Sequence, residues 1–439
     1  MAQTSQQESR DIPTARIYAD IRGEYVTASL RNLAAASVST ARKTTADAIY
    51  RQGTNGIGMY ATGVEGAFIA EYENICQIFP RDDWNKVFLA TSQGALSEFA
   101  RTLRELNTHI KNNMITDCFL AYEIVDIVSN LALRIERKST SEVKKPIAEA
   151  LKPVRETAKT SLQKLLDDTR SRIQNLVALP ADGGTLPAVT EIMTRLETMT
   201  AYTSPLGSIL ASLGDGGWST TGAGPSSSVP SLKSFDVAPD GRNLFSHYAS
   251  DMMDVLMSNL ETKARALLKS RPVQGIFMAN NVAVIERMIR SSELQDLLGD
   301  SLLSKLDAWR KKGIGMYLDA WKEPSTFLLD VQYTSRASRP QSGGGFDSAA
   351  IIKSLSNKDK DALKEKFKNF NQSFDDLIAR HKGYRMEKEI RVTVAKDIQG
   401  IIEPLYGRFW DRYRDLDKGK GKYVKYDKQQ LSQQLQSLA

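Results

Sequence analysis

Apolar residues recur at intervals of three and four along almost the whole chain of 439 residues. Residues spaced in this way share one face of an α-helix, so each run predicts a helix with a single apolar stripe. We find no convincing series of alternating positions that would indicate strands. The clearest stripes are Phe68/Tyr72/Ile75/Phe79, Leu96/Phe99/Leu103/Leu106/Ile110, Ile124/Ile127/Val128/Leu131/Ile135, Ile147/Leu151/Val154/Ala158/Leu162/Leu165, Met252/Leu256/Leu260/Leu267, Leu302/Leu306/Trp309/Met316 and Leu363/Phe367/Phe370/Phe374/Leu377.

Long helices separated by short breaks predict an all-α fold of consecutive stacked helical bundles. Three breaks are rich in Gly, Pro, Ser or Thr, at residues 179–187, 214–239 and 335–345. Such composition is typical of loops and linkers. The predicted organisation is a disordered polar head (1–11), a first bundle (12–153), a second bundle (154–334) with a mobile loop (214–239), a linker (335–345) and a basic C-terminal bundle (346–439).

Two prolines, Pro146 and Pro153, lie near the first of these boundaries. Proline is tolerated in the first turn of a helix but costs about 3 kcal/mol in its interior. We therefore expect both prolines to mark helix starts.

The positive charge of the chain is concentrated at one end. The whole sequence has a net charge of +7, with 59 Lys and Arg against 52 Asp and Glu. Residues 331–439 contain 22 Lys and Arg against 14 Asp and Glu, a net charge of +8, and the preceding residues sum to −1. This asymmetry favours an acidic partner at the C-terminal end, although a solvated helix face is the alternative.

The most basic segment is Lys418–Lys428, where five lysines and one aspartate give a local charge of +4. Its lysines are Lys418, Lys420, Lys422, Lys425 and Lys428, interleaved with Tyr423 and Tyr426. Lysine suits phosphate groups, and tyrosine suits a boundary between water and lipid. The pattern predicts contact with an anionic surface.

The charge of this segment is too small for firm membrane attachment on its own. Each cation near an anionic leaflet contributes about 1 kcal/mol, so +4 gives a dissociation constant near the millimolar range. Additional cations or several bound lipids are needed. Candidates are Arg412, Arg414, Lys364 and Lys368. Lys364 and Lys368 share one flank of a predicted helix with Lys360, and they would add to the charge of the segment if that helix packs beside it.

Catalytic and metal-binding patterns are nearly absent from the sequence. His109, His247 and His381 have no partner at metal-ligand spacing, and adjacent acidic pairs such as Asp167-Asp168 and Asp375-Asp376 are typical of solvated helix surfaces. The segment Gly53–Gly58 lacks the residues of a phosphate-binding loop, and a helix-ending turn explains it better.

The cysteine content and the hydropathy pattern limit the cellular compartments in which the protein is expected. Cys76 and Cys118 are the only cysteines and lie in apolar helical patterns, which indicates core residues in a reducing cytosol. The sequence has no run of 18 apolar residues that would span a membrane and no secretion signal at its start.

Four stretches resemble the family of the seventy-kilodalton subunit of the exocyst, the complex that tethers secretory vesicles. They are Tyr50–Gly56 leading into Phe68–Glu73; Gly275–Glu286, with its Phe-x-x-Asn-Asn pattern; Phe367–Asp376 followed by Ile401–Phe409; and Lys422–Tyr426 with the helix after it. The resemblance runs from about Ile17 to Ala439. Members usually carry a further helical section before this point, and we expect that section, which bundles with other subunits, to be absent here.

The resemblance implies an elongated rod of helical bundles without enzymatic activity or cofactor. It implies binding of phosphatidylinositol 4,5-bisphosphate at the C-terminal tip, where Lys422 and Lys425 match the family's lipid-contacting lysines. It also implies partners among exocyst subunits and Rho-family GTPases, and a cytoplasmic protein placed peripherally at the inner face of the plasma membrane.

Three alternatives stay open at this point. The tyrosines could fasten the last helix while the lysines point to water. Lysines interleaved with tyrosines could instead bind single-stranded nucleic acid, although no nucleic-acid-binding module is recognisable and we expect no such partner. An enzyme would need a pocket with convergent polar groups, for which the sequence gives no nucleophile–base pair.

Overall fold

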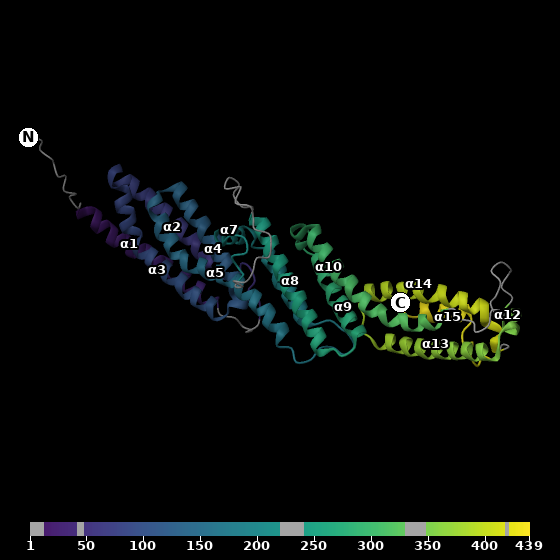
Figure 1. The fold of residues 1–439 in the computed structure, drawn as a ribbon. Coiled ribbons are helices and arrows are strands. Elements are labelled where there is room, and N and C mark those ends of the chain that lie inside the picture. The colour runs from purple at the N-terminus through teal and green to yellow at the C-terminus, as the bar shows by residue number, and fades with distance from the viewer. Residues whose placement is uncertain (1–12, 42–47, 220–240, 330–347, 418–420) are drawn as a thin grey trace, which may run out of the picture. The chain divides into compact units, whose positions relative to one another are not determined.

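The computed structural model describes residues 13–41, 48–219, 241–329, 348–417 and 421–439, and within these ranges every regular element is helical. The four 3₁₀ segments are η1 (Arg81–Asp83), η2 (Ser141–Val143), η3 (Asp319–Trp321) and η5 (Arg414–Asp417). The α-helices are α1 (Pro13–Ser39), α2 (Ile57–Ile78), α3 (Trp84–Asn112), α4 (Met114–Lys138), α5 (Lys144–Gln174), α6 (Pro187–Thr200), α7 (Thr203–Leu213), α8 (Gly241–Leu267), α9 (Arg271–Arg290), α10 (Leu294–Leu318), α11 (Lys322–Phe327), α12 (Ser348–Ser354), α13 (Asn357–Gly383), α14 (Lys388–Tyr413) and α15 (Lys428–Gln436) (Figure 1).

The chain folds as two compact units. The first contains residues up to 169 and residues 195–252, and the second contains residues 170–194 and 253–439. The units divide the chain differently from the three bundles predicted above, whose boundaries stay predictions. The linker at 335–345 and the head at 1–11 lie outside the described residues.

The apolar stripes bury their helices as the periodicity predicts. All five residues of the Leu96–Ile110 stripe and all six of the Ile147–Leu165 stripe are buried in the first unit. The Leu363–Leu377 stripe is equally buried in the second unit. Each buried Leu, Ile or Phe side chain contributes about 1.5–3 kcal/mol relative to an exposed one, so the stripes determine which helix faces pack.

The expectation that Pro153 begins a helix is wrong. Pro146 lies in the first turn of α5, but Pro153 lies inside that helix, which continues unbroken to Gln174. Leu151 and Val154, on either side of the proline, are both buried in the same stripe. Packing of this continuous apolar face therefore outweighs the cost of the proline.

The first residues of segment 214–239, which was expected to be a loop, pack against α8. Trp218 is buried against Tyr248, with ring centroids 5.7 Å apart, and its indole N–H donates to Asp251 at 2.8 Å. Residues 220–240 of this segment lie outside the described part of the chain. The predicted break at 179–187 is non-helical as expected up to Leu186, and α6 begins at Pro187.

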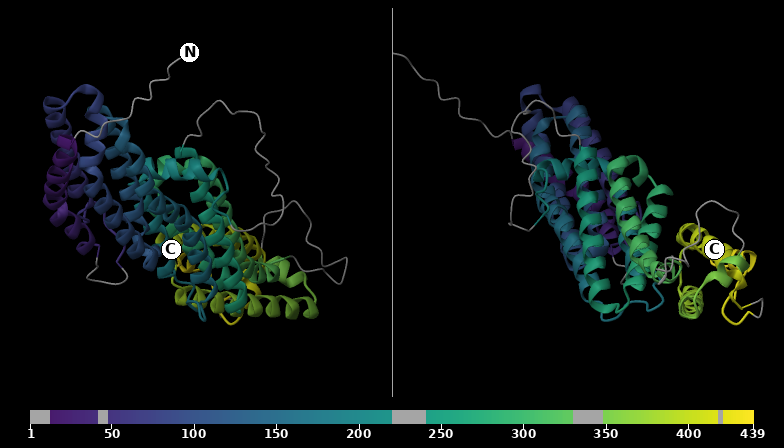
Figure 2. Two further views of the ribbon diagram at one scale, coloured as in Figure 1. Left: turned by 90° about the vertical axis from the view of Figure 1, so that its left-hand side faces the viewer. Right: turned by 45° about the vertical axis from the view of Figure 1, so that its right-hand side comes forward.

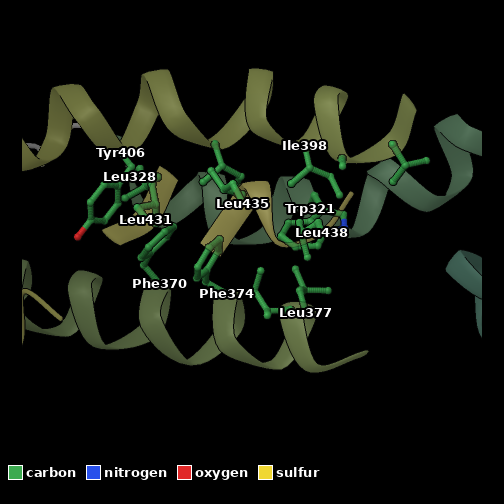
Figure 3. Close-up of a cluster of buried hydrophobic side chains, with 14 of the residues drawn as sticks. Trp321, Leu328, Phe370, Phe374, Leu377, Ile398, Tyr406, Leu431, Leu435 and Leu438 are labelled. Atoms are coloured by element: carbon green, nitrogen blue, oxygen red, sulfur yellow. The ribbon is translucent and has the colours of Figure 1, made fainter. Parts of the chain in front are cut away.

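The C-terminal core of the second unit lies between α13, α14 and α15. Helices α13 and α14 run side by side, and α15 lies between them (Figures 1 and 2). Phe370 and Phe374 of α13 face Tyr406 and Ile398 of α14 across the leucines of α15, and Trp321 closes the same cluster (Figure 3). This core positions the segment that precedes α15.

A buried asparagine joins three segments of the second unit. The amide nitrogen of Asn280 in α9 donates to the carbonyl oxygens of Gly183 and Arg385, both at 2.7 Å. Its carbonyl oxygen accepts the backbone N–H of Glu387 at 2.9 Å. The Asn280 side chain thus fixes both the loop before α6 and the connection from α13 to α14.

We predict that Asn280→Ala destabilises the second unit by about 3 kcal/mol, because one buried and two partly buried backbone groups lose their partner at about 1 kcal/mol each. The check is urea denaturation monitored by circular dichroism. Asn259→Ala is the matched control, since Asn259 is bonded at the surface. Equal stability of the two variants would contradict the assigned role.

Candidate functional site: the C-terminal loop

The candidate site is the closing loop, residues 421–427, which directly precedes α15. Two side chains from the flanking helices hold its backbone. Asn371 of α13 donates to the carbonyl oxygen of Tyr423 at 2.8 Å, and the hydroxyl of Tyr406 in α14 donates to that of Tyr426 at 2.6 Å. Asp417 accepts the backbone N–H of Tyr423 at 2.9 Å. The loop is therefore fixed to two helices at once.

The helix after the loop begins with a capping box. Asp427 accepts the backbone N–H of Gln430 at 2.7 Å, and the Gln430 side chain accepts that of Asp427 at 3.0 Å. This reciprocal pair satisfies donors that the helix itself cannot satisfy. Leu431, Leu435 and Leu438 are buried, so the apolar face of α15 anchors the C-terminal end of the loop.

The tyrosines of the loop fasten it to α13. The Tyr426 hydroxyl donates to Asp375 at 2.5 Å, and its ring meets the edge of Phe374 at 5.7 Å. Tyr423 is partly buried and receives the Asn371 bond through its carbonyl. The alternative in which the tyrosines hold the last helix thus has direct geometric support, and it leaves the lysines at the surface.

Two lysines of this segment form ion pairs with carboxylates from other helices. Lys425 pairs with Asp375 of α13 at 2.5 Å, and Lys428 pairs with Asp411 of α14 at 2.6 Å. Both lysine side chains are nearly half exposed, at 48% and 47%. Exposed pairs of this kind contribute about 0–1 kcal/mol, so both ammonium groups can exchange partners.

Lys422 and Lys364 both lie close to the ring of one tyrosine, Tyr423. Their ammonium groups are 5.4 and 5.9 Å from the centre of the Tyr423 ring. Lys422 is exposed and has no carboxylate partner within the ranges that the structure describes, whereas Lys364 pairs with Asp361 at 2.8 Å. The condition that α13 packs beside the loop is therefore met.

The other predicted lipid-binding residues are placed as follows. Lys368 is exposed on α13, one turn after Lys364. Arg414 stacks on Trp410 at 5.1 Å and lies 4.0 Å from Asp415. Arg412 lines a hollow with Leu328 and Phe409. Lys418 and Lys420 lie outside the described residues.

The partners of the acidic residues near the loop were not predicted from the sequence. Asp375 lies at the surface of α13 as predicted, with its side chain 38% exposed, but it also binds both Lys425 and Tyr426. Asp168 of the other acidic pair likewise binds Arg195, at 2.6 Å. Charge counted along the sequence therefore overstates the free positive charge of the loop, because its counter-charges come from distant positions.

Neither Lys425 nor Tyr426 changes its charge near neutral pH. The hydrogen bond to Asp375 is the main cause that raises the pKa of Lys425 above its ordinary value. Burial is the main cause that raises the pKa of Tyr426. Lys425 consequently stays protonated and Tyr426 stays neutral throughout the physiological range.

His109, His247 and Gly53 each contact a carboxylate. Nε2 of His109 lies 3.0 Å from Asp117, and Nδ1 of His247 lies 3.0 Å from Asp215. Gly53 has a φ of 76°, and its N–H donates to the carboxylate of Glu123 at 3.1 Å. The turn precedes α2, so the expectation of a helix-ending turn is wrong, and Glu123 occupies the donor that a phosphate would need.

The described residues offer neither a cluster of metal ligands nor a helix suited to cross a membrane. These residues contain no group of three or more His, Cys, Asp or Glu side chains placed to hold a metal ion. None of the helices traced there combines the length and the apolar character that crossing a bilayer requires.

His381 links the end of the chain to the core. Its Nε2 lies 3.0 Å from the carbonyl oxygen of Leu438, and its Nδ1 lies 2.6 Å from the hydroxyl of Tyr317. A carbonyl only accepts, so Nε2 carries the proton and Tyr317 donates to Nδ1. Burial lowers the pKa of His381 below its ordinary value of 6.5.

Residues 54–437 match a family model described as the C-terminal part of the Exo70 exocyst complex subunit. The chain is 52% identical to the exocyst complex protein EXO70 of Gibberella zeae, over 97% of this chain and 67% of that protein. It is 51% identical to the exocyst complex protein exo70 of Neurospora crassa, over 98% and 68%. The chain thus spans about two thirds of the length of these relatives.

A solved structure of Saccharomyces cerevisiae Exo70 shares the fold. It matches with a TM-score of 0.67 at 21% identity, covering 96% of this chain and 76% of the solved one. The all-α fold class predicted from the sequence is confirmed by this likeness and by the helices of the described residues.

We predict that the unfolding free energy falls as the pH drops below 6.5, in part through His381. The unfolded histidine takes up a proton near pH 6.5 while the buried one stays neutral, so stability is complete above 6.5 and declines below it. The slope for one proton is at most about 1.4 kcal/mol per pH unit. Urea denaturation between pH 7.5 and 5 measures it.

His381→Gln tests this assignment, because a glutamine can donate to Leu438 and accept from Tyr317 without titrating. Its stability should depend less on pH than that of the parent protein. His247→Gln, which alters an exposed histidine, is the control. An unchanged slope in the His381 variant would show that this residue does not titrate on unfolding.

Proposed function

This chain belongs to the Exo70 family of exocyst subunits, and we propose that it docks secretory vesicles at the plasma membrane by binding phosphatidylinositol 4,5-bisphosphate. The binding surface consists of Lys422, Lys425 and Lys428, joined by Lys364 and Lys368 of α13. Lys418, Lys420, Arg412 and Arg414 extend it. The protein acts through binding surfaces without chemistry of its own, at the inner face of the membrane.

The observation that carries this proposal is the attachment of the closing loop to α13 and α14. Hydrogen bonds to the carbonyls of Tyr423 and Tyr426 fix the backbone, so the lysine side chains project from a defined surface. The ammonium groups of Lys364 and Lys422 lie 5.9 and 5.4 Å from the centre of the Tyr423 ring, which places cations from two segments at one site. Ordering the surface before binding reduces the entropy lost on contact with a headgroup.

The ion pairs of the loop are compatible with lipid binding. An exposed pair contributes about 0–1 kcal/mol, and a cation near an anionic leaflet contributes about 1 kcal/mol. A headgroup with several phosphate charges can therefore replace Asp375 as the partner of Lys425. Attachment still requires several lipids or several copies of the protein on one vesicle.

Nucleic-acid binding is the weaker alternative. Stacking of bases requires free aromatic faces. Tyr426 packs against Phe374 and bonds to Asp375, and the ammonium groups of Lys364 and Lys422 already lie near the Tyr423 ring. Neither ring is presented as an open stacking platform.

We propose two further partners on the basis of family membership alone. Other exocyst subunits and a Rho-family GTPase are expected to bind this chain, and no residue is assigned to either contact.

We predict that Lys422→Ala combined with Lys425→Ala lowers binding to vesicles containing phosphatidylinositol 4,5-bisphosphate by about thirtyfold, because the two lysines contribute about 1 kcal/mol each. Co-sedimentation at physiological salt measures the change. The control is Lys382→Ala combined with Lys388→Ala, which removes the same charge from exposed sites at the junction of α13 and α14. Equal binding by both double variants would contradict the proposal, and a gel shift with single-stranded DNA tests the alternative.

We also predict that Asp375→Asn strengthens vesicle binding about fivefold. The change frees Lys425 and removes one negative charge from the surface, worth about 1 kcal/mol, while the amide oxygen still accepts from Tyr426. The control is Asp296→Asn, which makes the same change in total charge at an exposed position of α10. Weaker binding by the Asp375 variant would show that the carboxylate positions Lys425 for lipid instead of competing for it.

A further inference from the structure

A second group of cations lines a groove of about 710 Å³ within the second unit. They come from the end of α8, the connection to α9, and helices α9, α10 and α11: Arg265, Lys269, Arg271, Lys312 and Lys322. We call this feature the lateral groove. Its cations belong to the part of the sequence whose net charge is −1, so counting charge along the chain does not reveal it.

Part of the lining of the lateral groove is apolar, and we call this part its floor. Met316, Leu318 and Ile401 line it together with Gly315. Helices α9 and α10 are packed too closely for larger residues where Gly275 meets Gly313: a Cβ atom on Gly275 would lie 2.4 Å from the Gly313 carbonyl oxygen. This close packing fixes the spacing between α9 and α10. Arg271 and Lys312 lie on these two helices, and Lys269 lies just before α9.

Two carboxylates only partly neutralise the groove. Asp319 pairs with Arg271 at 3.3 Å and with Lys322 at 2.7 Å. Glu261 pairs with Lys312 at 2.7 Å and also with Arg265. The five cations and these two carboxylates give a net charge of +3.

The cations of the groove are available to a partner. Lys269 is exposed and has no ion pair within the described ranges. The Arg271 and Lys322 side chains are both 69% exposed, and pairs this exposed contribute about 0–1 kcal/mol. An incoming carboxylate can therefore take over these cations at little cost.

We propose that the lateral groove docks an acidic segment of a partner protein that carries an aliphatic side chain between its carboxylates. Arginine binds carboxylates with paired hydrogen bonds, and the excess of cations complements an acidic segment. The apolar floor requires an apolar group from the partner. A bilayer surface or a free inositol phosphate supplies negative charge alone and leaves Met316, Leu318 and Ile401 uncovered.

Fluorescence anisotropy with a labelled peptide of about 12 residues, composed of Glu and Asp with two central Leu, tests the groove. The intact chain should bind it at micromolar concentration, and Lys269→Glu with Arg271→Glu should weaken binding about tenfold or more. Glutamate is favourable in the first turn of α9, so this variant is expected to fold. Lys322→Glu is a second variant, at an exposed position on α11.

Peptides and the loop variant separate the possible outcomes. A peptide with Ser in place of Leu should bind several-fold more weakly. Equal binding of the two peptides would mean that the groove recognises charge alone, as a lipid headgroup or an inositol phosphate would supply it. That result would overturn the proposal. Failure of the parent peptide to bind, or equal binding by the groove variants, would also overturn it. Lys422→Ala with Lys425→Ala should bind the peptide normally, so this result is independent of vesicle binding.

Discussion

Hydrogen bonds to two carbonyl oxygens, those of Tyr423 and Tyr426, determine where the cations of the closing loop lie. Asn371 of α13 and Tyr406 of α14, which are 35 positions apart in the sequence, make these bonds. Both helices are held by the aromatic core around Phe370 and Phe374, and the buried leucines of α15 hold the other end of the loop. The lipid-binding surface that we propose therefore depends on the packing of the C-terminal core as much as on its lysines.

Counter-charges set the strength of this surface. Asp375 and Asp411 come from α13 and α14 and pair with Lys425 and Lys428, so the local field is smaller than the lysine count suggests. The same logic applies to the lateral groove, where Asp319 and Glu261 each serve two cations. In both places the pairs are exposed, and the charge is available to a partner with more than one acidic group.

The sequence predicts the helices and much of the core, because buried stripes such as Leu363–Leu377 follow the helical period directly. The sequence alone leaves open whether α13 packs beside the closing loop. It does not predict the pairing of Asp375 with Lys425, or the lateral groove, since each joins residues from different helices. Pro153 shows the same limit: local preference suggests a helix start, and burial on both sides of the proline decides otherwise.

Spin labels test most directly whether the closing loop faces the membrane. One label replaces Gln429, in the first turn of α15, and another replaces the exposed Thr393 of α14, in a chain with Cys76→Ser and Cys118→Ala. On vesicles containing phosphatidylinositol 4,5-bisphosphate, the label at 429 should become less accessible to a water-soluble relaxation reagent, and the label at 393 should not. Loss of accessibility at 393 with none at 429 would contradict the proposed orientation.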